Sequence, residues 1–224
     1  MTIAALPRYS RAQVMSASPI VVSLVTLLLV AFLLWFALGT QRNIRKGNDV
    51  LRWLQGGLPE LGSRTTLRWL GSSVVELKIS QARAPFSEAT VMVVLEPRDV
   101  SVLWALARAR RRRDFLVMRA RLRRAPAFEL EAGRAGTFTG RDRLDRLDPE
   151  AWSTGLWEHP SVEVAHTAEA DVAAVRALWD AFGSSSGQAW RISVRRDAPH
   201  VEVHTRLPDI DSVDPRELLG AFQR

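Results

Sequence analysis

The hydrophobic and polar positions divide the chain into one long apolar segment and a larger part with short, alternating patterns. Residues 19–40 read PIVVSLVTLLLVAFLLWFALGT, and no residue from Ile20 to Leu38 is charged. A helix of roughly 19 residues, at about 1.5 Å per residue, nearly matches the ~30 Å hydrocarbon core of a bilayer. We therefore expect a transmembrane helix at 19–40, preceded by a short N-terminal tail at 1–18.

A cleaved signal peptide is the alternative interpretation of this segment. Ala37 and Gly39 provide a small-x-small pattern, but the apolar run is longer than the roughly 7–15 residues usual in signal peptides. Basic residues would also follow the cut at once, so the pattern favours an uncleaved anchor. Aromatic and basic residues mark the ends of membrane spans. The expected interface consists of Trp35, Phe36, Arg42, Arg45 and Lys46.

The basic residues on either side of the apolar segment predict its orientation. Arg8 and Arg11 precede it, whereas Arg42, Arg45, Lys46 and Arg52 follow it. Short flanking segments rich in Lys and Arg remain on the cytoplasmic side. We expect a single-pass protein of the plasma membrane with its C-terminal domain in the cytoplasm.

The segment 41–63 is expected to form a juxtamembrane helix and linker. Its apolar residues have helical spacing from position 50, and Gly56-Gly57 is a stop signal. Beyond it, alternating or continuously apolar runs predict strands at 65–70, 74–80 and 88–97. A helix is expected at 101–110.

The remaining patterns predict a mostly antiparallel α+β domain. Strand 114–122 is expected to form a hairpin with 128–132, and the Gly-, Asp- and Arg-rich stretch after it reads as a long connection. A strand at 161–166 and a helix at 168–182 precede a hairpin of 189–196 with 200–207 and a last helix from Asp214. The order strand, helix, strand, strand thus occurs twice. It suggests two βαββ-like lobes, at 64–140 and 161–224, joined by a connector at 141–160.

The composition of the chain gives it a strong net positive charge. The chain has 224 residues, with 31 Lys and Arg against 24 Asp and Glu and a net charge of +7. Basic proteins are attracted to polyanions and acidic lipid surfaces. Cysteine is absent, which excludes disulfides, thiolate metal sites and cysteine nucleophiles.

The densest positive charge lies in residues 107–124, which read ARARRRRDFLVMRARLRR. The expected basic patch consists of Arg108, Arg110, Arg111, Arg112, Arg113, Arg119, Arg121, Arg123 and Arg124. A partner protein with an acidic surface and the anionic membrane surface are both candidate ligands. Nucleic acid is disfavoured, because the stretch lacks the glycine and the repeated aromatic residues typical of RNA-binding motifs.

Catalytic motifs are mostly missing. GSSSG at 183–187 matches the nucleophile-elbow pattern, but a helix precedes it and a strand follows, the reverse of what the elbow needs. GRAGTFTG at 133–140 lacks the Gly-Lys-Ser/Thr ending of a phosphate-binding loop. Candidate metal ligands are His166, His200, Glu202 and His204, the last three on one face of a strand. The solvent face of an ordinary strand would have the same spacing.

These patterns favour a membrane-anchored accessory or scaffold protein that acts by binding. We expect no cofactor, a protein partner, membrane lipid around 19–40 and contact with anionic headgroups. The alternative is a membrane-tethered metal-dependent or hydrolytic enzyme that uses the His/Glu cluster.

Overall fold

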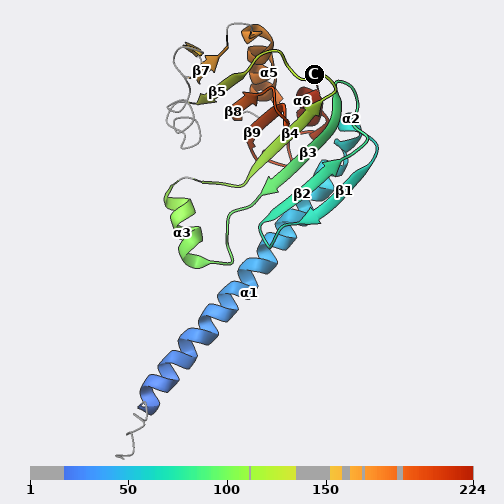
Figure 1. Ribbon diagram of the computed structural model, residues 1–224. Helices are drawn as coiled ribbons and strands as arrows, with labels where there is room; N and C mark the ends of the chain where they lie inside the picture. Colours follow the sequence, from blue (N-terminus) through green and yellow to red (C-terminus); the bar gives the residue numbers. More distant parts are fainter. Residues whose placement is uncertain are drawn as a thin grey trace, which may run out of the picture.

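The computed structural model describes residues 18–110, 112–134, 152–157, 162–167, 170–185 and 189–223. A long N-terminal helix projects from a domain in which helices pack against one sheet (Figure 1). The helices are α1 (Pro19–Gln55), α2 (Leu58–Leu61), α3 (Ser101–Ala109), α5 (Val172–Ser185) and α6 (Pro215–Gln223). The strands are β1 (Thr65–Trp69), β2 (Val74–Ile79), β3 (Phe86–Val94), β4 (Phe115–Leu122), β5 (Leu130–Arg134), β6 (Ser153–Trp157), β7 (Val162–His166), β8 (Ala189–Val194) and β9 (Val201–Arg206).

The nine strands form a single antiparallel sheet in the order β1-β2-β3-β4-β9-β8-β5-β7-β6. This arrangement confirms the α+β fold class. The hairpin expected between 114–122 and 128–132 is wrong, because β4 pairs with β3 and β9 while β5 pairs with β7 and β8. Strands from 64–140 and 161–224 are therefore interleaved in one sheet. The division of the chain into two lobes stays a prediction.

The hydrophobic core lies between one face of the sheet and four of the helices. Alternation along the strands turns Met118, Leu130, Ile192 and Val203 toward this face, and each is fully buried. The C-terminal part of α1, together with α2, α5 and α6, contributes apolar side chains to the same cluster. The opposite sheet face carries the charged residues that alternate with this core.

Helix α1 differs from the expected arrangement because it is continuous for 37 residues. The juxtamembrane helix predicted within 41–63 is the last part of this helix, and it ends before Gly56 as expected. Every residue from 18 to 38 is exposed, whereas Gly39, Asn43, Gly47, Val50, Leu51 and Leu54 are buried against the domain. One continuous helix thus joins the apolar segment to the core.

The last third follows the predicted elements with two differences. β6 forms within the expected connector, and it pairs with β7 at the edge of the sheet. α5 begins at Val172 and continues to Ser185, past the expected end at residue 182. The hairpin of β8 and β9 and the final helix α6 are confirmed.

Candidate functional site

The four candidate metal ligands are not brought together. His166 contacts the carbonyl oxygen of Thr167 through Nδ1 at 2.9 Å, and the Nδ1 atom of His200 accepts a hydrogen bond from the backbone of Leu122 at 3.0 Å. Only His204 and Glu202 are in contact, at 2.8 Å. Among the described residues, no group of three or more His, Cys, Asp or Glu side chains could hold a metal ion.

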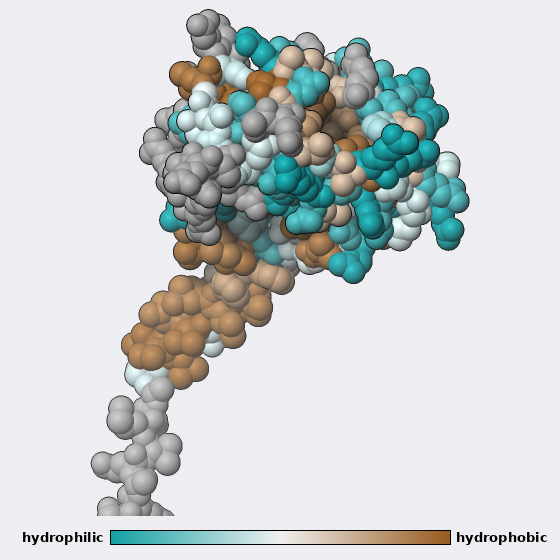
Figure 2. All heavy atoms as spheres, turned by 45° about the horizontal axis from the view of Figure 1, so that its top comes forward, coloured by the Kyte–Doolittle hydropathy of each residue, from teal (hydrophilic) through white to brown (hydrophobic). Residues whose placement is uncertain are grey.

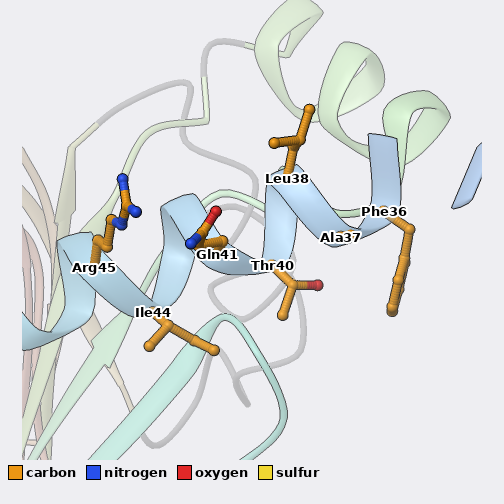
Figure 3. Close-up of a pocket in the computed structure, with 7 residues that line it drawn as sticks. All are labelled: Phe36, Ala37, Leu38, Thr40, Gln41, Ile44 and Arg45. Carbon is orange, nitrogen blue, oxygen red and sulfur yellow. The ribbon is translucent and has the colours of Figure 1, made fainter. Parts of the chain in front are cut away.

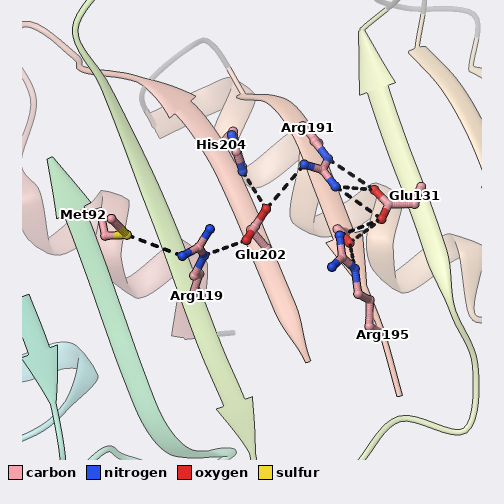
Figure 4. Close-up of polar contacts among 8 residues, drawn as sticks. Met92, Arg119, Glu131, Arg191, Arg195, Glu202 and His204 are labelled. Carbon is pink, nitrogen blue, oxygen red and sulfur yellow. Dashed lines mark hydrogen bonds and ion pairs between the residues drawn. The ribbon is translucent and has the colours of Figure 1, made fainter. Parts of the chain in front are cut away.

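Glu202 belongs instead to a ladder of alternating charges that crosses four strands (Figure 4). Arg119 on β4 donates to Glu202 on β9 at 2.6 Å, and Arg191 on β8 contacts the other carboxylate oxygen at 3.4 Å. Arg191 also donates to Glu131 on β5 at 3.1 Å, and Arg195 reaches Glu131 at 3.1 Å. In this charge ladder Arg119 of β4 is paired with an acid from β9, and Arg191 of β8 is paired with acids from both β9 and β5.

The surroundings of Glu202 keep its carboxylate charged. Burial by itself would raise the pKa of Glu202, but the hydrogen bond and charge of His204, followed by those of Arg119, lower it from 4.5 to about 2. Charge-assisted hydrogen bonds of this kind favour the ionised form. The ladder is therefore a network of paired charges on the sheet face opposite the core.

The predicted basic patch is divided by β4 into two groups. Arg108, Arg110, Arg112 and Arg113 lie in α3 and just after it, and we call them the proximal arginines. Arg121, Arg123 and Arg124, the distal arginines, lie at the opposite end of β4 and are exposed. A strand of this length separates the groups by roughly 25 Å at about 3.3 Å per residue. Arg119 lies between them in the charge ladder, and Arg111 lies outside the described residues.

The proximal end of β4 is attached to α1 by a second charged cluster, which we call the junction. Asp114 is buried there and forms ion pairs with Lys46 of α1 and with Arg98, the latter at 3.0 Å. The backbone N–H of Glu96 also donates to Asp114 at 2.7 Å. Burial would raise the pKa of Asp114, but hydrogen bonds from Arg98, Lys46 and Glu96 hold it below its ordinary value.

Asn43 extends the junction into the body of α1. Its amide nitrogen donates to the carbonyl oxygen of Glu96 at 3.0 Å, and its amide oxygen accepts from Arg98 at 3.1 Å. The Glu96 carboxylate accepts from the indole N–H of Trp104 at 2.8 Å. Since Asn43 is fully buried, the loop after β3 holds α1 through several specific polar contacts.

Sequence reasoning missed this junction, although one signal for it was present. Gly39, Asn43 and Gly47 recur every four residues and so lie on one face of a helix. A Cβ at position 39 would overlap the backbone of Arg98, and one at position 47 would overlap the ring of Trp69. A stripe of small residues just after an apolar segment therefore marked a close helix contact.

The expected interface residues of α1 lie beside the junction. A groove of about 660 Å³ follows α1 and is lined by Phe36, Ala37, Leu38, Thr40, Gln41, Ile44 and Arg45 (Figure 3). Its lining changes from apolar to polar in the direction of the domain. Trp35 contacts Trp104 of α3, Arg42 and Arg45 are exposed, and Lys46 pairs with Asp114. By length and composition α1 could cross a membrane.

No protein-family model matches the chain, and no curated protein matches it significantly. Functional conclusions therefore depend on the junction, the charge ladder and the two groups of arginines.

Proposed function

We propose that the chain is a single-pass membrane protein whose C-terminal domain acts by binding, as an accessory or scaffold component at the membrane surface. Its ligands on this proposal are a partner protein and anionic lipid headgroups. The domain lies in the cytoplasm, where the basic residues after the span remain and the leaflet is acidic.

The observation that carries the proposal is the sharp change in burial along α1. Residues 18 to 38 are all exposed, and the next residue, Gly39, is packed against the backbone of Arg98. Figure 2 shows the exposed part as a continuous hydrophobic surface leading to the domain. Exposed apolar surface on this scale is unfavourable in water, and a bilayer would remove it.

The same continuity supports an uncleaved anchor. Signal-peptide cleavage after Gly39 would cut a regular helix directly after the residue that packs against the backbone of Arg98. The four residues that follow lead to Asn43, which is fully buried in the junction. The anchor and the domain are therefore joined by one continuous helix, which suits a protein that presents a binding surface at a fixed distance from the membrane.

Binding is favoured over catalysis because the buried charges of the sheet face are paired with one another. Glu202 is engaged by Arg119, Arg191 and His204. Glu131 is engaged by Arg191 and Arg195. The pKa of Glu202 is lowered to about 2, whereas a general acid or base needs a pKa near the working pH.

The two groups of arginines suit different ligands. The proximal arginines lie in α3 and just after it, and α3 contacts Trp35 near the end of the apolar segment, where anionic headgroups would lie. The distal arginines are at the far end of β4, and we assign them to a partner protein with an acidic surface. Electrostatic complementarity of this kind governs specificity and association rate.

Protease protection of a C-terminal tag tests the proposed topology. The tag is expected to survive protease in intact cells and to be cut once the membrane is opened. Extraction with alkaline carbonate serves as the companion measurement, and the chain should stay in the pellet. A tag that is cut in intact cells overturns the cytoplasmic orientation, and release by carbonate overturns the anchor.

A further inference from the structure

Helix α3 is unusual because it buries none of its residues. Its Val102, Leu103 and Leu106 side chains are 73%, 51% and 45% exposed. The other helices of at least eight residues in the described chain each bury an apolar stripe in the core. A helix with an exposed apolar face requires a ligand for that face or a local environment that is not water.

The opposite face of α3 is held by the protein. The ring of Trp104 lies 6.1 Å from that of Trp35 in α1, and its N–H donates to Glu96. One turn later, Arg108 lies over the Trp104 ring at 5.3 Å and 3.9 Å from Glu96. Residues four apart share a helix face. Trp104 and Arg108 thus attach α3, while Val102 and Leu106 point away from the attachment.

The contact between Trp35 and Trp104 sets the level of α3 along α1. Trp35 lies in the last turn of the exposed apolar segment, which ends at Leu38. On the proposed function, this turn is where the span leaves the hydrocarbon, and tryptophan side chains prefer that depth. Figure 2 shows hydrophobic surface on the part of the domain that adjoins the exposed helix. The contact between Trp35 and Trp104 therefore places α3 near the level at which the exposed apolar segment ends.

We propose that α3 is an interfacial helix that lies in the cytoplasmic surface of the bilayer. Val102, Leu103 and Leu106 enter the boundary between headgroups and acyl chains, and three of the proximal arginines, Arg110, Arg112 and Arg113, contact anionic headgroups. An apolar face flanked by arginines is the pattern of helices that bind in the interface plane. This inference rests on the proposed anchor, and it adds a second attachment that fixes the tilt of the domain.

Lipid fits this face better than a protein partner does. A standard protein interface buries about 800 Å² on each partner, which is far more than three exposed side chains offer. A bilayer is already present at this level if α1 spans it, so no separate partner has to be recruited. The positive charge of the proximal arginines also complements an anionic leaflet.

The absence of cysteine allows the test to be made on the full chain. Single-cysteine variants Leu103→Cys, Leu29→Cys and Leu156→Cys place one fluorophore each on α3, on the apolar segment and on the edge strand β6. All three positions are exposed, so the labels do not disturb the core. Each labelled chain is placed in nanodiscs of anionic lipid and quenched by nitroxide lipids or by aqueous iodide.

The proposal expects the label at 103 to be quenched by nitroxide near the headgroup and shielded from iodide. The label at 29 should respond to nitroxide deep in the acyl chain, and the label at 156 to iodide alone. If the label at 103 is quenched by iodide alone, like the label at 156, while the label at 29 lies in the hydrocarbon, the proposed interfacial position of α3 is overturned and the anchor stands. If 29 is also reached by iodide, the anchor itself fails. Shielding of 103 without lipid quenching indicates a protein on this face and also overturns the inference.

Discussion

Gly39 of α1 packs directly against the backbone of Arg98, so closely that a Cβ at position 39 would overlap the Arg98 carbonyl group. This contact lies one residue after Leu38, where the continuously exposed part of α1 ends. It therefore joins the apolar helix to the loop between β3 and α3 at the point where the helix enters the domain.

Gly39→Ala is expected to destabilise the protein despite the higher helix propensity of alanine. Alanine favours a helix over glycine by up to ~1 kcal/mol, whereas overpacking costs about 1–3 kcal/mol. Gly220→Ala in α6 is the matched control, because a Cβ there meets nothing within 4 Å. Thermal unfolding in detergent should show a lower Tm for Gly39→Ala and an unchanged or higher one for Gly220→Ala. Equal shifts would contradict the close contact.

Asp114→Asn is expected to weaken the junction strongly. The substitution removes the negative charge that Lys46 and Arg98 share, and breaking a buried pair costs about 3–5 kcal/mol. Asp49→Asn breaks the exposed pair with Arg52 and should cost less than ~1 kcal/mol. The free energy of unfolding, measured by chemical denaturation of the full chain, distinguishes the two. Similar losses would show that the junction does not stabilise the fold.

The charge ladder predicts a loss of stability in acid. The folded-state pKa of Glu202 is about 2, against an ordinary value of 4.5. A carboxyl group with a lowered pKa stabilises the fold above its ordinary pKa, and this contribution is lost as the pH falls toward the folded value. Arg119, Arg191 and His204 face Glu202 and are the cations involved. Stability should therefore decline between pH 4.5 and about 2.

Glu202→Gln is the variant that assigns this decline to the ladder. Its stability should be lower at neutral pH and should fall less over the acid range than that of the unchanged protein. Unfolding free energies at several pH values provide the comparison. Parallel curves for the two proteins would assign the acid sensitivity to other carboxyl groups.

The two groups of arginines are expected to respond differently to lipid charge. A triple change of Arg110, Arg112 and Arg113 to Gln removes the same charge as a triple change of Arg121, Arg123 and Arg124. Each basic residue at an anionic surface contributes ~1 kcal/mol. A spin label on an Ala109→Cys background should be less accessible to a water-soluble relaxant in anionic than in neutral nanodiscs. Only the proximal triple should abolish that difference, and a loss with the distal triple would contradict the assignment.

Elemental analysis of the purified chain tests the enzyme alternative. We expect no stoichiometric transition metal and no change in metal content on His204→Ala. Glu202 already accepts from Arg119 and Arg191, and His200 accepts from a backbone N–H through Nδ1. A bound metal that His204→Ala removes would revive a metal-dependent activity.

The local elements of this fold were determined by the sequence itself. The apolar run from Ile20 to Leu38 is a signal contained in one segment of the chain, and so is the alternation of apolar and polar residues in β2 and β9. Gly71 at the turn between β1 and β2 has a positive φ of 82°, a conformation that suits glycine. Such features depend on neighbours along the chain, so the predicted elements mostly match the structure.

Only the tertiary structure decided which of these elements meet. β5 follows β4 in the chain, yet it pairs with β7 and β8, because strand order depends on contacts between distant segments. The fold also places the proximal and distal arginines of one sequence stretch at opposite ends of β4. It brings Glu202 into contact with Arg119, which lies 83 residues earlier in the chain. It also brings Trp104 against Trp35, and this contact is what turns an unremarkable amphipathic helix into a candidate membrane-surface helix.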